Sequence, residues 1–253
     1  MSHLERQDDI LAILSNQKIA SVSKLAETLY VSEATIRRDL IHMDNLGLIR
    51  RTHGGAMMTN NTAQESSFAL REAENLTAKK TICSLAVQHI TDHSVIYMDS
   101  SSTIMPIIPM LQRFHHLTVI THGIRTALLL ANLENIDVFV AGGKVGNFSN
   151  SILGNSVIEF YEHINAEIAL LSCSGINEKG DITDNSIEHA KIKRTIINKS
   201  SQVFMLVDHT KFDHTMMNTT FKLKDVDYLI TDQTPSDHYL SIIDASNCKL
   251  IKP

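Results

Sequence analysis

The sequence predicts an α/β protein in two parts, a small domain of three helices and a hairpin followed by a larger domain built on a mostly parallel sheet. Within residues 1–57, apolar side chains recur at helical spacing in three short segments. Beyond residue 75, six short apolar runs alternate with helical patterns, as buried parallel strands do. Residues 58–74 between them are rich in Asn, Thr, Ser and Gln without a period, which predicts a linker.

The composition excludes several classes of protein. No apolar run reaches the roughly 20 residues of a membrane span, and the acidic start is unlike a signal peptide. We therefore expect a cytoplasmic protein without a membrane partner. The three cysteines lie far apart without ligand spacing, which predicts buried free thiols. The 13 histidines lack the spacing of a metal site, and we expect neither a metal nor a cofactor.

The net charge of −5 argues against a nucleic-acid partner only until the charges are located. Residues 1–60 hold seven Lys or Arg and seven Asp or Glu, so the whole excess of acid belongs to the rest of the chain. Four of the seven basic residues form two adjacent pairs, Arg37-Arg38 and Arg50-Arg51. A neutral domain with paired arginines can still present one basic face.

The helices of the first domain follow from apolar spacing and caps. The first is expected over residues 4–16 and the second around Leu25 and Leu29, with Ser21 or Ser23 as the N-cap of the second. A tight turn then leads into a third helix, which is expected to begin after the N-cap Ser32 and to end at Gly47. Its inward-facing residues are Ile36, Leu40 and Met43.

Residues 48–56 follow the third helix as a small basic hairpin. Three helices and a hairpin make a winged helix-turn-helix, whose second "recognition" helix enters the major groove of DNA. Paired arginines alone would equally suit a solvated helix face. The capped helix, the tight turn, the paired arginines, the glycine stop and the basic hairpin together favour DNA binding.

This region resembles the DeoR family of bacterial regulators of sugar metabolism. The resemblance rests on Glu5-Arg6 and on SVSKLAETLYVSEATIRRDLIHMDNLGLIRRTHGGA, residues 21–56. It implies a winged-helix domain that binds double-stranded operator DNA, most often in a repressor. By the matching positions, the DNA contacts would be Ser32, Thr35, Arg37 and Arg38 on the recognition helix, with Arg50, Arg51 and His53 in the wing.

The larger domain, residues 75–253, is expected to begin with an amphipathic helix over residues 77–90. The predicted strands are 95–98, 117–120, 138–141, 168–171, 203–207 and 228–230. Small, hydroxyl-bearing or charged residues follow every run, at the carboxyl ends where open α/β sheets bind their ligands. Six such endings in register predict one shared pocket.

The residues at these endings suit a phosphorylated polyol. Hydroxyl and N–H groups at the start of a helix suit a phosphate, and here they belong to Ser100, Ser101, Ser102 and Thr103. Asp99 and Asp208 suit sugar hydroxyls, and Lys144 or Lys211 offers a charge-assisted contact. Thr121, His122, Gly142 and Gly143 follow the second and third strands.

This half also resembles the C-terminal effector domain of the DeoR family, which is similar in fold to ribose-5-phosphate isomerase. The matching positions add Gly154, Gly175, Thr183, Glu188 and Lys191 to the residues above. The chain departs from the family's Asp-x-Gly-Thr-Thr, where Ser101 replaces the glycine, and His122 replaces the usual Asn. The identity of the effector should therefore not be copied from any relative.

These observations predict a transcriptional regulator, a repressor of a carbohydrate-metabolism operon that a phosphorylated sugar releases from its operator. A lone winged helix buries little DNA, so a homo-oligomer, dimer or tetramer, is expected. The reading requires no catalysis. The alternative is a sugar-phosphate isomerase-like enzyme with an appended DNA-binding domain, because the second domain resembles an enzyme fold. A scaffold that uses the winged helix for protein contacts has little support in the sequence.

Overall fold

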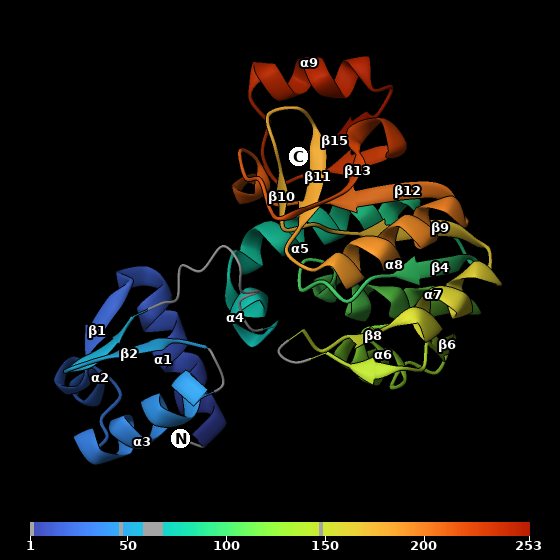
Figure 1. The fold of residues 1–253 in the computed structure, drawn as a ribbon. Helices are drawn as coiled ribbons and strands as arrows, with labels where there is room; N and C mark the ends of the chain where they lie inside the picture. Colours follow the sequence, from blue (N-terminus) through green and yellow to red (C-terminus); the bar gives the residue numbers. More distant parts are fainter. Residues whose placement is uncertain (1–2, 46–47, 58–67, 147–148) are drawn as a thin grey trace. The chain divides into compact units, whose positions relative to one another are not determined.

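The computed structural model describes residues 3–45, 48–57, 68–146 and 149–253. The chain divides into two compact units, Met1–Glu74 and Asn75–Pro253. The colours of Figure 1 run from blue in the first unit to red at the end of the second.

Within residues 3–57, the described part of the first unit forms three helices and a small antiparallel sheet, which confirms the predicted winged helix-turn-helix. Its helices are α1 (His3–Gln17), α2 (Val22–Thr28) and α3 (Glu33–Asn45). Its strands are β1 (Ile19–Ser21), β2 (Arg50–Thr52) and β3 (Gly55–Met57), in the order β1-β3-β2. Strand β1 is not predicted, because three residues with a single buried side chain leave no period to detect.

One apolar core holds the first unit together. Ile36, Leu40 and Met43 are buried, as predicted, and they share this core with Leu25 and Ile49. Burying one such side chain contributes about 1.5–3 kcal/mol. Helices this short are marginal on their own, so the shared core stabilises them. The predicted end of the third helix at Gly47 lies outside the described residues.

Part of the expected linker is helical. Residues 68–73 form α4 (Phe68–Ala73), which packs against α1 and buries Phe68. The expectation of an irregular linker over residues 58–74 is therefore wrong for this segment, because one large apolar side chain favours burial. Residues 58–67 lie outside the described residues.

A seven-stranded sheet forms the centre of the second unit, and all of its neighbouring strands are parallel. Its strands are β4 (Val95–Met98), β5 (Leu117–Thr121), β6 (Ile136–Val140), β9 (Ala166–Leu171), β12 (Ser200–Leu206), β14 (Tyr228–Ile230) and β15 (Lys249–Ile251). The first six correspond to the predicted strands, although β6 and β9 begin two residues earlier than expected and β12 begins three residues earlier. The short strand β15 is not predicted.

Helices cover both faces of this sheet. They are α5 (Leu76–Ala86), η1 (Val87–His89), η2 (Met105–Arg113), α6 (Ile124–Leu130), α7 (Asn155–Glu162), α8 (Ile187–Asn198), η3 (His209–Lys211), η4 (Leu223–Asp225) and α9 (Asp237–Ala245). Met205 of β12 packs in one cluster with Tyr161 of α7 and Ile192 of α8. Its neighbour Phe204 points to the opposite face, where it meets His89 of η1. Together α5 and η1 account for the helix predicted over residues 77–90.

Two small antiparallel sheets complete the second unit, and neither is predicted. Their strands are β7 (Lys144–Val145) and β8 (Ile152–Leu153) in one, and β10 (Gly175–Ile176), β11 (Asp181–Asp184) and β13 (Asn218–Lys222) in the other. Most are too short to show an alternating pattern.

The order of the large sheet is β15-β14-β12-β9-β4-β5-β6. The chain starts at β4, adds β5 and β6 on one side, and then returns to add β9 and the remaining strands on the other. The chain leaves β4 toward one side of the sheet and leaves β9 toward the other. Where neighbouring strands diverge in this way, a crevice opens at their carboxyl ends, and open α/β sheets bind their ligands there. The fold therefore points to the residues that follow β4 and β9.

Candidate functional site

The N-terminus of α3 is held by a side-chain cap. Ser32 Oγ accepts the backbone N–H of Thr35 at 3.2 Å and lies 2.9 Å from the Thr35 hydroxyl. Glu33 follows in the first turn, where an acid suits the positive end of the helix dipole. Ser32 and Thr35, both expected to contact DNA, thus also fix where the helix begins.

The solvent-facing side of α3 carries the paired arginines. Arg37 and Arg38 are exposed, whereas Ile36, which directly precedes them, is buried. Arg37 Nη2 lies 2.7 Å from Glu33 Oε2 one turn earlier, which holds its side chain along the helix. Arg38 forms no ion pair with any described residue, so its guanidinium is available to a phosphate or a base edge.

A buried ion pair that the sequence does not predict fixes α3 against α1. Arg6 Nε lies 2.5 Å from Asp39 Oδ2, and Arg6 Nη2 lies 3.2 Å from Asp39 Oδ1. The Asp39 side chain is 2% exposed, and its hydrogen bond raises the pKa of Arg6. Because Asp39 directly follows Arg38, this bidentate contact orients the outward face of the same helix.

The wing presents its basic residues to solvent. Arg50 and Arg51 on β2 and His53 in the following turn are exposed. The backbone N–H of Arg51 donates to Asp44 Oδ1 at 3.1 Å, which ties β2 to the last turn of α3. This hydrogen bond links the wing to the helix that carries the other expected DNA contacts.

Asp99 lies at the crevice of the large sheet. It follows β4, and its carboxylate accepts the backbone N–H of Ser101 at 2.7 Å. It also accepts the N–H of Ser172, which follows β9, at 2.9 Å. Asp99 is 1% exposed. Each carboxylate oxygen accepts one backbone hydrogen bond, so the Asp99 side chain holds the loop after β4 against the loop after β9.

A chain of buried hydrogen bonds runs from Ser151 through Ser100 and His122 to Tyr161. The two serine Oγ atoms lie 2.7 Å apart, Ser100 Oγ lies 3.2 Å from His122 Nε2, and His122 Nδ1 lies 3.1 Å from the Tyr161 hydroxyl. Burial lowers the pKa of His122 well below 6.5, and burial raises the pKa of Tyr161 well above 10. The ring and the tyrosine hydroxyl are therefore both neutral, and the tautomer of the ring decides which of the two donates the hydrogen bond between them.

The buried cation of this region is Lys193, which the sequence does not single out. Its Nζ lies 2.8 Å from Asp184 Oδ1, 2.6 Å from the carbonyl oxygen of Ser172 and 4.0 Å from Asp99 Oδ2. Burial alone would lower the pKa of Lys193, but the two carboxylates outweigh burial and raise it. The ammonium group is therefore charged. Lys191, expected at the pocket, is exposed on the same helix.

Helix α5 contacts two of the predicted ligand loops. Lys79 is 3% exposed, and its Nζ lies 3.3 Å from Ser102 Oγ. Asn75, just before the helix, places Nδ2 3.4 Å from Asp208 Oδ1 and 3.3 Å from Thr210 Oγ1. Neither Lys79 nor Asn75 is predicted as a site residue, because no strand ending or motif marks them.

Several buried oxygen atoms at this edge have no hydrogen-bond partner within the described part of the chain. They belong to Ser101 after β4, Ser172 after β9, Asp208 after β12 and Thr231 after β14. Leaving a buried polar group unpaired costs about 1–3 kcal/mol. Several unpaired buried oxygens at one edge therefore indicate a site where a bound molecule supplies the missing hydrogen bonds. The polar cluster comprises these four side chains together with Asp99, Ser100, His122, Ser151, Asp184 and Lys193.

The other predicted pocket residues differ in burial. Thr121 is buried and its hydroxyl accepts the backbone N–H of Gly123. Gly175 has a packing role, since a Cβ there would lie 2.5 Å from the carbonyl oxygen of His214. Ser102 and Thr103 are buried and Lys211 is half-buried. The residues that the structure leaves exposed, outside the polar cluster, are Gly142, Gly143, Lys144, Glu188 and Lys191.

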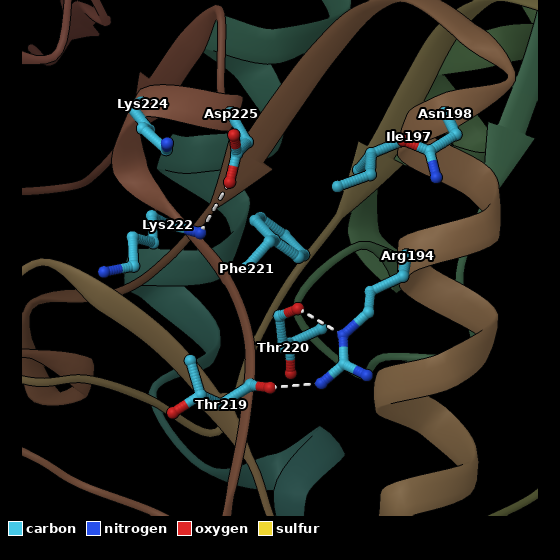
Figure 2. Close-up of a pocket in the computed structure, with 9 residues that line it drawn as sticks. All are labelled: Arg194, Ile197, Asn198, Thr219, Thr220, Phe221, Lys222, Lys224 and Asp225. Carbon is cyan, nitrogen blue, oxygen red and sulfur yellow. Dashed lines mark hydrogen bonds between the residues drawn. The ribbon is translucent and has the colours of Figure 1, made fainter.

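A cavity of about 600 Å³ lies between α8, β13 and η4, formed by residues outside the polar cluster. Figure 2 shows Arg194 reaching from α8 to β13, where it donates to the carbonyl oxygens of Thr219 and Thr220. Lys222 lies 3.4 Å from Asp181 Oδ1. These cations already have partners, and none of the described residues that line the cavity has a buried unpartnered oxygen. The polar cluster is therefore the better candidate site.

The three cysteines, Cys83, Cys173 and Cys248, are buried, as predicted. Burial raises the pKa of each thiol to about 12, which makes them unreactive. Within the described ranges, no three His, Cys, Asp or Glu side chains gather as metal ligands would. A search of the same residues finds no helix with the length and apolar character of a membrane span.

Comparison with known protein families matches both units. Residues 6–62 match the DeoR-like helix-turn-helix domain, and residues 74–233 match the DeoR C terminal sensor domain. The second match alone covers more than half of the chain.

Relatives of known role match nearly the whole length. The HTH-type transcriptional regulator GolR of Listeria innocua is 31% identical, over 92% of this chain and 91% of that protein. The L-fucose operon activator of Haemophilus influenzae is 30% identical, over 92% and 93%. The glycerol-3-phosphate regulon repressor of Escherichia coli is 26% identical, over 96% and 99%.

Among solved structures, the chain is similar to a D-ribose-5-phosphate isomerase in complex with phospho-erythronic acid, at 15% identity. The TM-score is 0.41 over 54% of each chain. This likeness is distant, whereas the two domain matches and the relatives agree over nearly the full sequence. The chain therefore belongs to the DeoR family of transcriptional regulators, with a DeoR-like helix-turn-helix domain followed by a DeoR C-terminal sensor domain.

Proposed function

We propose that this chain represses a carbohydrate-metabolism operon and that a phosphorylated sugar, bound at the polar cluster, releases it from operator DNA. The observation that carries the proposal is the set of unpartnered buried oxygens of Ser172, Asp208 and Thr231 at the carboxyl edge of the sheet. The hydroxyl groups of a polyol can donate to the Asp208 carboxylate, and they can donate to or accept from the Ser172 and Thr231 hydroxyls. Binding such a ligand would remove the cost of leaving these atoms unpaired.

The phosphate of the effector fits the loop after β4. Ser100, Ser102 and Thr103 supply hydroxyl groups there, and the loop lies against the buried Lys79. A charged donor makes a stronger hydrogen bond to a phosphate oxygen than a neutral one. Lys79 therefore joins Lys211 as a proposed phosphate contact, and both support a dianionic ligand over a neutral sugar.

The engagement of Asp99 and Asp184 supports sensing without catalysis, and the unpartnered Asp208 Oδ2 is assigned to a sugar hydroxyl. An isomerase needs a carboxylate free to take a proton from its substrate. Asp99 accepts two backbone N–H groups, and Asp184 contacts Lys193 and the Thr220 hydroxyl at 2.8 Å. Both acids are thus engaged in holding the site together. Turnover of aldopentose phosphates above about 1 per second would overturn this part of the proposal.

Helix α5 is the proposed route from the sensor site to the DNA-binding unit. It begins at Leu76, two residues after Glu74, the last residue of the first unit. Lys79 on the helix contacts the loop after β4, and Asn75 just before the helix contacts the loop after β12. Effector binding at those loops would shift α5. A coupling of about 1–3 kcal/mol, which is typical of allosteric proteins, would change operator affinity about 5- to 150-fold.

Repeated half-sites and a cytoplasmic location complete the proposal. A single winged helix contacts one half-site, so we expect a dimer or tetramer of this chain on the operator. Operator DNA and phosphorylated sugars meet in the cytoplasm, where we place the protein. The relatives named above include both a repressor and an activator, and measuring transcription from the operator with and without the effector tests the sign.

The experiment is a screen of sugar phosphates, each paired with its unphosphorylated parent sugar. A thermal shift identifies the ligand, and fluorescence anisotropy with DNA from upstream of the regulated operon measures its release. Lys211→Ala should bind DNA normally and lose the response to the ligand. Lys199→Ala, another half-buried lysine, should behave as the wild type. If no sugar phosphate changes either stability or DNA affinity, the effector proposal fails.

A further inference from the structure

The seven-stranded sheet ends in two edge strands of different character, β15 and β6, which Figure 1 shows at opposite ends of the sheet. The exposed Lys249 lies on β15, and Lys252 and Pro253 follow it directly. Lysine and proline are residues by which natural proteins keep an edge strand from pairing with another chain. The β15 edge is therefore protected against association.

The β6 edge lacks such protection. Phe139 is 52% exposed and Val140 is 42% exposed. Helix α6 packs against β6 and exposes Leu128 and Leu129, and Val145 on β7 is exposed nearby in the sequence. These five residues, named here the β6 patch, hold five of the eleven large apolar side chains that are exposed within the described ranges. Because successive side chains of a strand point to opposite faces, Phe139 and Val140 expose apolar area on both faces beside this edge, and a strand added at the edge would cover part of each.

The backbone of β6 also has a free side. The carbonyl oxygen of Asn135 accepts from the N–H of Leu117, and the N–H of Ala141 donates to the carbonyl oxygen of Thr121. The backbone N–H and C=O groups of the odd-numbered residues in this segment therefore point toward β5. Because successive residues of a strand alternate, the N–H and C=O groups of Ile136, Val138 and Val140 point away from β5. Within the described ranges, no other strand pairs with that side of β6. Both the backbone and the side chains of this edge are therefore ready for a partner.

We propose that a second copy of this chain docks on the β6 patch, with the two β6 strands paired antiparallel about a two-fold axis. A surface that binds its own copy must be self-complementary. The exposed charges between residues 124 and 145 balance, with Arg125 and Lys144 against Glu134 and Asp137. Such a surface does not repel its own copy. Antiparallel pairing also brings the end of β6 that carries Asp137 toward the partner's end that leads to Lys144.

This inference deepens the proposed function and rests on it for the expectation of an oligomer. Sedimentation velocity of the full chain over a range of concentrations measures self-association. Phe139→Lys and Val140→Lys alter exposed side chains, so both variants should fold and should weaken self-association at least tenfold. Ile187→Lys alters an apolar side chain of similar exposure, 56%, on α8 and should associate as the wild type does. Wild-type association in both β6 variants would overturn the proposal.

Cross-linking provides a second test that does not depend on a charge in the interface. Symmetric pairing of the free groups of Ile136, Val138 and Val140 places the two copies of Val138 opposite each other. The native cysteines are buried, so a cysteine introduced by Val138→Cys should form a disulfide-linked dimer under mild oxidation, whereas Ile187→Cys should not. Cross-linking at Ile187→Cys but not at Val138→Cys would overturn the proposal. Operator binding is measured separately. Failure of the wild type to bind any operator would contradict the proposed function, while the sedimentation result would still decide the β6 interface.

Discussion

The two units of this protein place their functional side chains in opposite environments. In the first unit, Arg37 and Arg38 lie exposed on one helix, close together in the sequence and outside the core. In the second unit, Asp99, Ser172 and Lys193 are buried and come from distant parts of the chain. The residues proposed to contact DNA can therefore be changed with little effect on stability, whereas the residues of the polar cluster also hold its loops together.

The largest effect that tests this comparison is expected at Lys193. Lys193→Met leaves Asp184 and Asp99 buried without their shared cation, which should destabilise the second unit by about 3–5 kcal/mol. Lys191→Met, two residues earlier on the exposed face of α8, should stay within about 0.5 kcal/mol of the wild type. Denaturant unfolding measures both. Equal destabilisation by the two variants would contradict the assignment of Lys193 as the buried cation.

The same pair of lysines shows where sequence reasoning succeeds and where it stops. Strand endings predict that Asp99 lies at one edge of the sheet with the residues after the other strands, because parallel strands align their carboxyl ends. The contact with Ser172 follows from the observed pairing of β4 with β9. The same reasoning cannot tell which lysine of α8 faces that edge. Lys193 follows the buried Ile192 and lies three residues before the buried Ile196. This position on the apolar face of α8 is the sequence signal that identifies Lys193 as the buried lysine.

A second effect, on binding alone, is expected at Arg38. Arg38→Ala should weaken operator binding by about 1–3 kcal/mol and relax sequence preference if the guanidinium contacts a base. It should leave the unfolding free energy unchanged, because the side chain is exposed. Lys24→Ala on α2 removes an exposed cation paired with Glu27 and serves as the control. Footprints that are identical for Arg38→Ala and the wild type would remove α3 from the role of recognition helix.

The first unit is predicted more completely than the second, for a physical reason. Its core is built from helices that are adjacent in the sequence, so apolar spacing alone identifies Ile36, Leu40 and Met43 as buried. Its unpredicted features, β1 and the Arg6–Asp39 ion pair, depend on pairing across the fold. Such long-range contacts dominate the second unit, where the small sheets and the environment of Lys79 depend on strands that no local pattern reveals.

A smaller effect should appear in the pH dependence of stability, through His122. Its folded-state pKa is lowered well below 6.5, so below about pH 6.5 the unfolded state binds one more proton than the native state. The stability from this neutral ring is therefore complete above about pH 6.5 and falls by up to about 1.4 kcal/mol per pH unit as the pH decreases. His122→Asn should remove that slope. His163→Asn, at an exposed position, should retain it, and equal slopes in His122→Asn and the wild type would mean that the ring is charged.

The smallest effect is expected at Asn75, next to the helix proposed to link effector binding to DNA release. Its contacts with Asp208 and Thr210 are 3.4 and 3.3 Å long, so Asn75→Ala should reduce the coupling between effector and operator by only about 0.5–1 kcal/mol. The affinities for each ligand alone should change little. Asn247→Ala is the matched control, because both residues have positive φ, 52° and 55°, and the same backbone strain follows from either substitution. Anisotropy titrations with and without the effector measure the coupling, and an unchanged ratio of operator affinities would exclude Asn75 from the path between sensing and DNA release.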